Sequence, residues 1–185
     1  MAEPRIISLG DSITYGYPFG NRYSWVELVS QKIGIPIINA GSNGDTFRNM
    51  ENRLLTDVVD QNPDYVIFLG GANDVYHGTP LETMQERFDR IVKNLIQHKI
   101  KPILGLPTPI DDKKHEGAIA PFRKFVKGYA KKKKLPVINF FDPFFEGKKR
   151  VSSGLLEDGV HPSVSGYRLM AEVATPVLQK ILKNS

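Results

Sequence analysis

The sequence predicts an α/β fold, in which helices pack on a central parallel β-sheet. Five short segments rich in apolar and β-branched residues recur along the chain, and nearly continuous apolar segments are typical of strands buried on both faces. Amphipathic stretches of helical length separate these segments, and the connections are short. This alternation predicts an α/β sandwich around a parallel sheet.

The expected strands and helices alternate in chain order. Strands are expected at Arg5–Leu9, Ile35–Asn39, Tyr65–Leu69, Pro102–Leu106 and Pro136–Phe140. Apolar residues at helical spacing predict the intervening helices, and we interpret these stripes as core packing: Trp25, Leu28, Val29 and Ile33; Leu54, Leu55, Val58 and Val59; Met84, Phe88, Ile91, Val92 and Leu95 within Pro80–His98; and Phe122, Phe125, Val126 and Tyr129. A closing helix, Ser163–Leu182, is expected to start at Pro162, because proline suits the first helical position.

Length and composition predict one soluble globular domain over residues 1–185. The 185 residues are 41% hydrophobic and 24% charged, and no linker, repeat or low-complexity segment is present. No apolar run approaches the roughly 20 residues of a membrane-spanning helix. The first residues, MAEPRIISLGDS, show no secretory signal, which favours a cytoplasmic location. The absence of cysteine excludes disulfides, thiolate metal sites and a cysteine nucleophile.

The net charge of +5 raises the question of nucleic-acid binding. The densest basic run, Lys131–Lys134, closes a predicted helix, where cations suit the helix dipole. A second cluster, Lys148–Arg150, falls in a predicted loop. Because no nucleic-acid or nucleotide motif accompanies these residues, we interpret them as solvated surface and expect no nucleic-acid partner.

Three polar, glycine-rich segments follow the first three predicted strands: residues 10–12 (GDS), 41–46 (GSNGDT) and 70–74 (GGAND). In open α/β sheets the functional residues lie beyond the carboxyl ends of the strands, so these segments converge on one edge. Ser12 lies there, at the tip of the first turn. A serine hydroxyl is a poor nucleophile until a general base accepts its proton, and histidine is the usual base near neutral pH.

The chain offers four histidines as this base. His98 ends a predicted helix and is expected to face water, and His115 lies in a charged segment, DDKKH, that we interpret as a solvated turn rather than a metal site. His77 follows the third strand and is a rival base. His161 lies three residues after Asp158, just before the last helix. This spacing can bring the carboxylate to one imidazole nitrogen and leave the other for a serine hydroxyl, as in a serine hydrolase.

Four blocks of the sequence resemble the SGNH hydrolases, the GDSL family of esterases and lipases. They are residues 10–13 (GDSI, with Ile in place of the usual Leu), Gly44 in NGDT, residues 71–74 (GAND) and residues 158–161 (DGVH). Each block alone is a weak pattern, but together they occur in order over nearly the whole chain. The resemblance implies a flavodoxin-like, three-layer α/β/α sandwich with a five-stranded parallel sheet.

The resemblance also implies catalytic roles for five residues. Ser12 would attack an acyl carbonyl, His161 would carry the proton, and Asp158 would orient the imidazole. The backbone N–H groups of Ser12 and Gly44 and the side-chain amide of Asn73 would bind the oxyanion. Water would then deacylate the serine, and no metal or cofactor is expected.

The expected activity is hydrolysis of carboxylic esters of small or short-acyl substrates. Asp11 is expected to organise the turn and not to be the acid of the triad. Of the aromatic residues Tyr15, Tyr17, Phe19 and Tyr23, some are expected to wall a compact apolar pocket, and no lid-like insertion is present. A carbohydrate acetylesterase and an acyltransferase are alternatives, as is a catalytically inactive flavodoxin-like binding module. The sequence predicts no particular oligomeric state.

Overall fold

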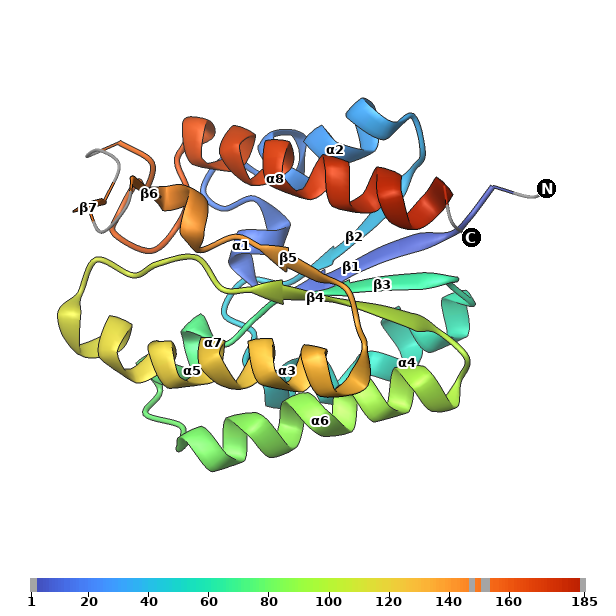
Figure 1. Cartoon of the computed structure of the whole chain (residues 1–185), viewed down its shortest axis with the longest axis horizontal. Helices are drawn as coiled ribbons and strands as arrows, with labels where there is room; N and C mark the ends of the chain where they lie inside the picture. The colour runs from blue at the N-terminus through green and yellow to red at the C-terminus, as the bar shows by residue number, and fades with distance from the viewer. Residues whose placement is uncertain (1–2, 147–148, 151–153, 184–185) are drawn as a thin grey trace.

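The computed structural model describes residues 3–146, 149–150 and 154–183. Figure 1 shows a central sheet with a layer of helices above it and another below it. Within the described residues this sheet has five strands, all parallel, in the order β2-β1-β3-β4-β5. The predicted three-layer α/β/α sandwich is therefore confirmed. The strands are β1 Ile6–Gly10, β2 Ile37–Gly41, β3 Tyr65–Phe68, β4 Lys101–Leu106 and β5 Val137–Asn139.

One face of the sheet is covered by the helices drawn above it in Figure 1. Trp25 and Tyr167 are fully buried between these helices and the sheet, which explains why the helices pack there. The short elements β6 and β7 pair antiparallel beside this layer. These elements are α1 Ser12–Tyr15, η1 Asn21–Tyr23, α2 Trp25–Ile33, η3 Asp142–Phe144, β6 Phe145–Glu146, β7 Lys149–Arg150 and α8 Val164–Lys183.

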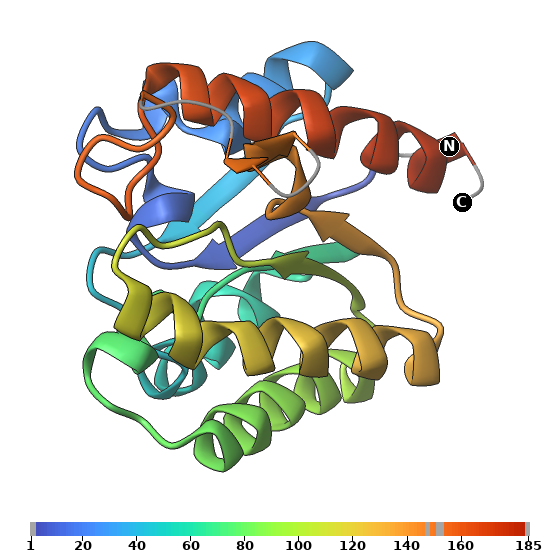
Figure 2. The same cartoon turned by 60° about the vertical axis from the view of Figure 1, so that its left-hand side comes forward.

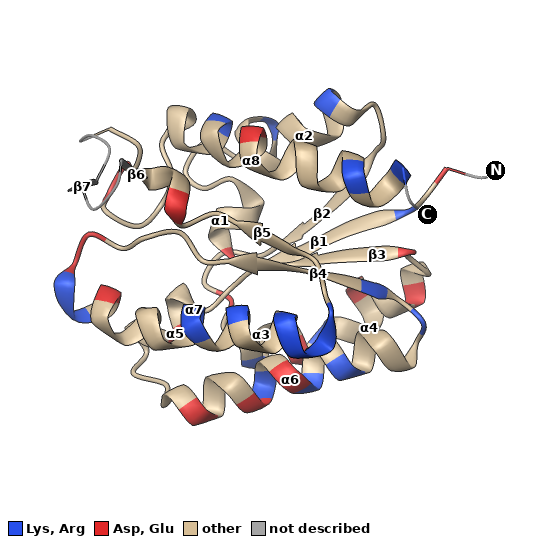
Figure 3. Cartoon of the chain, viewed as in Figure 1, with Lys and Arg blue, Asp and Glu red and all other residues tan. Residues whose placement is uncertain are grey.

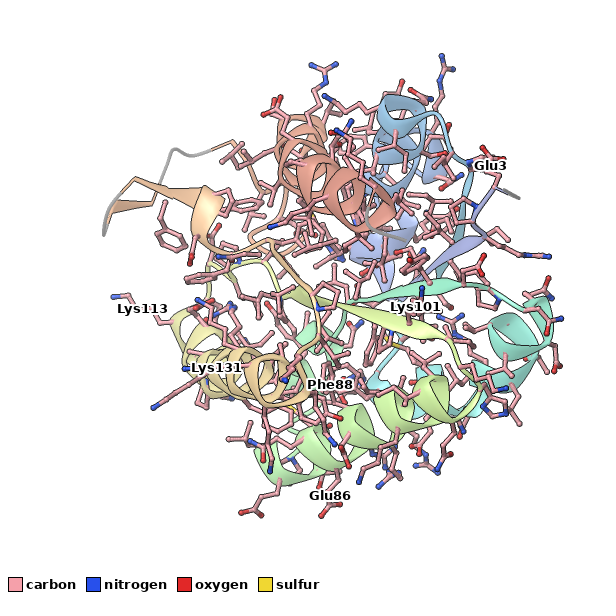
Figure 4. The ribbon with its side chains drawn as sticks, turned by 45° about the vertical axis from the view of Figure 1, so that its right-hand side comes forward. Glu3, Glu86, Phe88, Lys101, Lys113 and Lys131 are labelled. Carbon is pink, nitrogen blue, oxygen red and sulfur yellow. The ribbon has the colours of Figure 1, made fainter. Side chains whose placement is uncertain are left out.

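The other face is covered by a second layer of helices, and Figure 2 shows the two layers on opposite sides of the sheet. Phe88 of α6 is 2% exposed and contacts the rings of Phe68 and Phe122. Figure 4 labels Phe88 next to α6. An aromatic cluster of this size fixes how the helices sit on the sheet. The elements of this layer are α3 Phe47–Asn52, α4 Leu54–Asp57, η2 Val59–Gln61, α5 Ala72–Tyr76, α6 Leu81–Gln97 and α7 Lys113–Lys133.

The predicted apolar stripes are largely confirmed as core. All five apolar residues of the α6 stripe are at most 2% exposed: Met84, Phe88, Ile91, Val92 and Leu95. The exception is Leu55, which is 52% exposed. In place of one regular helix, the α-helix α4 ends at Asp57 and the 3₁₀-helix η2 follows from Val59. A single 3.6-residue period therefore does not hold over residues 54–61.

Two local predictions are wrong, and the first is the start of the last helix. The last helix begins at Val164, and the hydroxyl of Ser163 accepts a hydrogen bond from Gly166 N–H at 3.2 Å, as an N-cap does. Pro162 lies before this cap, in an antiparallel bridge with Leu156. The expected loop at the second basic cluster is the other wrong prediction: Lys149–Arg150 forms strand β7, and Lys148 lies outside the described residues.

The carboxyl ends of β1 and β2 are built for close contact with α1. Gly10 and Gly41 pair across the two strands. A β-carbon on Gly41 would clash with the backbone of Tyr15, and one on Gly10 would clash with the side chain of Thr14. Glycine at both positions therefore lets α1, with Ser12 at its start, rest directly on the sheet edge.

Candidate active site

Ser12 lies at the carboxyl end of β1, in the first turn of α1. Asp11 is the N-cap of this helix, and its carboxylate accepts a hydrogen bond from Ile13 N–H at 2.9 Å, so Asp11 organises the turn as predicted. The Ser12 hydroxyl Oγ lies 2.9 Å from Nε2 of His161. Ser12 is 7% exposed, so its hydroxyl is recessed at the edge of the sheet.

His161 lies in the turn that leads into α8. Oδ2 of Asp158 lies 2.7 Å from His161 Nδ1, and Oδ1 of the same carboxylate accepts hydrogen bonds from His161 N–H and Val160 N–H. Gly159 has a φ of 87°, a left-handed conformation that suits glycine. The D-x-x-H spacing therefore places a carboxylate against one ring nitrogen and Ser12 against the other.

The charge of Asp158 is set by competing effects. Desolvation raises its pKa, but hydrogen bonds from the backbone and the ring of His161 and from Val160 N–H outweigh desolvation, so the pKa lies below its ordinary value. Asp158 is therefore ionised at neutral pH. A carboxylate next to Nδ1 favours the tautomer with hydrogen on Nδ1, which leaves Nε2 as an acceptor for the Ser12 hydroxyl.

The turn over residues 156–162 is supported from two sides. The bridge between Leu156 and Pro162 closes the turn on itself. Asp111 N–H, in the segment between β4 and α7, donates a hydrogen bond to the Gly159 carbonyl at 2.8 Å. The position of the imidazole therefore depends on a segment that is distant in sequence.

That supporting segment is held by an ion pair between a buried arginine and a partly exposed glutamate. Arg123 of α7 is 5% exposed and donates hydrogen bonds to the carbonyls of Pro107 and Thr108, each at 2.9 Å. It also pairs with Glu116 at 2.6 Å, and Glu116 accepts a hydrogen bond from Ile110 N–H at 2.8 Å. This pair is not predictable from the sequence, because two opposite charges on one helix are typical of ordinary solvated surface.

Asn73 and Gly44 lie together at the same sheet edge. Asn73 is in the first turn of α5 rather than in the expected loop, and its Nδ2 donates a hydrogen bond to the Asp45 carbonyl at 2.9 Å. Gly44 has a φ of 81°, and nothing lies within 4 Å of the place where its β-carbon would be. The amide of Asn73 carries a second N–H for another acceptor.

The other three histidines contact neighbouring groups. Nδ1 of the exposed His77 lies 2.7 Å from the Asn73 carbonyl, and His98 is exposed at the end of α6 as predicted. The expectation of a solvated turn is wrong for His115, whose side chain is 20% exposed and whose ring stacks on Tyr76 at 3.9 Å between centroids. Among the described residues, no three His, Asp or Glu side chains are grouped to hold a metal ion.

Three buried carboxylates lie close to this site: Asp11, Asp45 and Asp74 are 1%, 8% and 1% exposed. Burial raises the pKa of Asp11 to about 7, and the neighbouring charges of Asp74 and Asp45 also raise it, against the opposing effect of the hydrogen bond from Ile13 N–H. Burial likewise raises the pKa of Asp74. Arg53, which the sequence analysis did not identify, pairs with Asp45 at 2.7 Å and thereby balances part of this buried charge.

The aromatic residues after Ser12 lie mostly at the surface. Tyr15, Tyr17 and Tyr23 are 40%, 42% and 43% exposed, and the compact apolar pocket that some of the four aromatic residues are expected to wall stays a prediction. Only Tyr17 among them is in ring contact with the site, with its centroid 4.6 Å from that of His161. The buried Tyr167 hydroxyl donates a hydrogen bond to the Tyr17 carbonyl at 2.7 Å, which fixes Tyr17 beside the imidazole.

A serine hydroxyl, an imidazole and a carboxylate in series, at the carboxyl edge of a parallel sheet, form the arrangement that serine hydrolases use. Residues 8–169 match the GDSL-like Lipase/Acylhydrolase family. The chain belongs to this family and is a carboxylic-ester hydrolase, so the resemblance noted in the sequence is confirmed.

Known proteins of similar sequence and structure agree with this family. A lipolytic protein of the G-D-S-L family from Desulfitobacterium hafniense superimposes with a TM-score of 0.87 at 32% identity, over 95% of this chain and 99% of that chain. An acetylxylan esterase from Geobacillus stearothermophilus is 27% identical over 79% of this chain and 73% of its own length. The protein named thioesterase 1/protease 1/lysophospholipase L1 from Escherichia coli is 23% identical over 99% of this chain and 87% of its own length.

No helix among the described residues is both long enough and apolar enough to cross a membrane. A lipoprotein from Bacillus subtilis, YqeF, is 30% identical over 57% of this chain and 49% of its own length. The cytoplasmic location and the absence of a nucleic-acid partner stay predictions.

Proposed function

We propose that the protein hydrolyses esters of short carboxylic acids through an acyl-enzyme on Ser12. The observation that carries this proposal is the 2.9 Å contact between Ser12 Oγ and His161 Nε2, with the ionised carboxylate of Asp158 at 2.7 Å from Nδ1. The three groups have the order and separations required for a general base to activate a hydroxyl.

The chemistry divides into two displacements. In the first, Ser12 Oγ bonds to the acyl carbon while its proton passes to His161 Nε2, and the tetrahedral adduct then collapses as His161 protonates the departing alcohol. In the second, His161 takes a proton from water, the hydroxide oxygen bonds to the acyl carbon, and the Ser12 hydroxyl leaves with its proton restored. Asp158 stays ionised and stabilises the imidazolium in both steps.

The oxyanion of each tetrahedral adduct needs hydrogen-bond donors. We assign this role to the backbone N–H groups of Ser12 and Gly44 and to the second N–H of the Asn73 amide. The hydrogen bond from Asn73 to the Asp45 carbonyl supports the assignment, because it orients the amide and leaves one donor for substrate. A donor of this kind typically lowers the barrier by about 2.7–4 kcal/mol.

The preference for short acyl groups is argued from Tyr17. Its ring lies 4.6 Å from the imidazole, and its backbone is fixed by the buried Tyr167 hydroxyl, so it takes up space immediately beside the reacting groups. A small acyl group such as acetyl fits this restricted space better than a long chain. An exposed ring at this place also offers a flat surface to the alcohol part of the substrate.

That exposed ring favours one more specific candidate, an acetylated carbohydrate. Tyr17 is 42% exposed beside His161, and sugar rings present C–H faces that pack on tyrosine. Relatives of this chain include a protein named acetylxylan esterase. An acetylated xylo-oligosaccharide is therefore the first natural substrate to test. Tyr17→Ala should raise its KM more than that of p-nitrophenyl acetate, whereas Tyr23→Ala, the matched exposed tyrosine, should change neither.

The catalytic assignment is tested with a fluorophosphonate and short p-nitrophenyl esters. The probe should add its phosphonyl group to Ser12, as located by peptide mass spectrometry, and His161→Ala should lose this labelling. Ser12→Ala, His161→Ala and the double variant should lose kcat to the same extent, because the residues act as one unit. His77→Ala is the matched control and should keep both labelling and kcat.

Three outcomes would contradict the proposal. If His77→Ala abolishes labelling of Ser12 and ester hydrolysis while His161→Ala retains both, the base is wrongly assigned. If the free acid is not released and the acyl group appears only on an added alcohol, the protein is an acyltransferase rather than a hydrolase. A folded protein that resists the probe and hydrolyses no ester would fit an inactive binding module.

A further inference from the structure

A cavity of about 1060 Å³ opens at the sheet edge opposite Ser12. Residues at the amino ends of β3, β4 and β5 line it, and the last turns of α6 and α8 form its sides. Because all strands of the sheet are parallel, the amino and carboxyl ends lie on opposite edges, so this cavity is separate from the candidate active site. Its volume is at the upper end of the range for small-molecule sites.

The cavity exists because β5 is short. Val137, the first residue of β5, pairs with Leu104. The first three residues of β4, 101–103, therefore have no β5 residue beside them. Pro102 carries no N–H, so no backbone donor is left unpaired at its position. The floor of the cavity is therefore apolar, and the buried residues Pro102 and Ile103 form part of it.

Four exposed lysines line this apolar floor: Lys99, Lys101, Lys134 and Lys180. Figure 3 shows basic residues gathered where α7 ends, where β4 starts and along the second half of α8, and Figure 4 labels Lys101 at the start of β4. Within the described part of the chain, none of the four forms an ion pair with a carboxylate. Lys101 Nζ donates a hydrogen bond to the Tyr65 hydroxyl at 3.3 Å.

Two of these lysines occupy backbone positions that are costly for lysine. Lys99 has a φ of 61° and Lys134 a φ of 56°, each just past the end of a helix, where glycine is usual. Among the described residues, the only other non-glycine residue with a positive φ is Asn62, and asparagine is a residue that commonly accepts this conformation.

The helix dipole does not account for Lys134, whereas α6 has no basic residue in its last turn and the same argument does not apply to Lys99. A cation in the last turn of a helix is stabilising, but Lys131, Lys132 and Lys133 already supply three at the end of α7. Glycine at position 134 would relieve the backbone without removing that effect. A residue held at a strained position is better explained by what its side chain does, and here both side chains border the same cavity.

We propose that this cavity binds the carboxylate of a long-chain, singly charged amphiphile, with the alkyl chain on the floor and the carboxylate among the lysines. Charge complementarity selects an anion, and the apolar floor selects a ligand with an alkyl chain. An inorganic anion would leave the floor uncovered. A second copy of this chain fits poorly, because a symmetric contact would bring two sets of four lysines together.

This inference is independent of the proposed catalytic function, because the ligand is bound and not transformed. The probe is decanoate, titrated below its micelle concentration into the Ser12→Ala protein and the wild-type protein. Decanoate should bind both with one site per chain by calorimetry. Acetate, which has the same head group without the chain, should bind at least about tenfold more weakly, since exposed charge pairs alone contribute little.

The location of the site is tested by variants that keep the fold. Lys99→Gly/Lys134→Gly removes two ammonium groups where glycine suits the backbone, and should weaken decanoate binding about threefold or more. Lys131→Ala/Lys132→Ala is the matched control, with the same loss of charge on residues outside the cavity, and should bind like the wild type. Ile96→Glu places a carboxylate at an exposed lining position and should also weaken binding. In NMR spectra, decanoate should shift the amides of Ile100 and Ile103.

Several results would overturn the proposal. Absence of decanoate binding would do so, as would equal binding of decanoate by the Lys99→Gly/Lys134→Gly variant. Equal affinity for acetate would show an adventitious charge interaction. Shifts confined to the amides around Ile13 would place the ligand in the active site. A wild-type dimer that Ile96→Glu converts to a monomer would show that the cavity is covered by a second copy.

Discussion

Replacement of Arg123 by methionine tests how much this side chain contributes to the free energy of unfolding. The guanidinium makes hydrogen bonds to the carbonyls of Pro107 and Thr108, and it pairs with both carboxylate oxygens of Glu116. Methionine keeps much of the volume of the arginine stem and removes every one of these interactions. The substitution therefore separates all the interactions of the guanidinium, including its contact with the Phe141 ring at 4.1 Å, from the packing of the arginine stem.

The expected loss of stability follows from what is left behind. Arg123 is 5% exposed, so after its removal the carbonyls of Pro107 and Thr108 lose their donor in a buried place. Glu116 keeps its charge and loses its partner. Breaking a fully buried pair by removing one partner typically costs about 3–5 kcal/mol, and because the Glu116 side chain is 29% exposed we expect a loss of about 2–3 kcal/mol for Arg123→Met.

Arg90 provides a matched control. It also pairs with a carboxylate, Glu51, through two hydrogen bonds of 2.6 and 3.1 Å, but its side chain is 51% exposed. An exposed pair contributes about 0–1 kcal/mol, so Arg90→Met should cost less than 1 kcal/mol. Urea unfolding followed by far-UV circular dichroism measures both variants against the wild type. Equal losses in the two variants, or a loss below about 1 kcal/mol for Arg123→Met, would refute the reasoning.

Three further predictions concern the site itself. Asn73→Ala should lower kcat by about 10²–10³ with a smaller change in KM, since the donor acts mainly in the transition state; a rise in KM alone would make Asn73 a ground-state contact. Asp158→Asn should lower kcat by about 10⁴ while the protein stays folded, and a loss below tenfold would show that His161 does not need this carboxylate. Because burial raises the pKa of Asp11 to about 7, its stabilising contribution is complete below about pH 4 and is lost as the pH rises through 7. Between pH 5 and pH 8 the wild type should therefore lose about 3 kcal/mol more stability in urea than Asp11→Asn, and equal losses would contradict the buried ionisation.

Patterns within short segments predicted much of this structure. The strand segments were recognised because a strand buried on both faces is apolar at nearly every position, as β1 is. The stripe of α6 was recognised because one face of a long, regular helix meets the core. Where the chain changes its helical period, as after Asp57, the same rule wrongly places Leu55 in the core. The predicted start of α8 at Pro162 is wrong because Ser163 caps the helix, which therefore begins at Val164.

The candidate site was predictable to the extent that its residues stand in recognisable local patterns. Ser12 follows a strand and His161 lies three residues after Asp158, and the structure brings all three together. Arg123 and Glu116 could not be identified, because their role arises only when the segment between β4 and α7 folds back over α7. The contact of Tyr17 with His161 likewise joins distant parts of the chain.

The contact between Ser12 and His161 spans 149 positions of the chain. During synthesis the serine leaves the ribosome 149 residues ahead of its histidine partner. Until α8 packs on the sheet and brings the preceding turn into place, the hydroxyl has no base and remains an ordinary alcohol. Chains truncated before this turn, or chains in which α8 has not packed, should therefore carry no esterase activity.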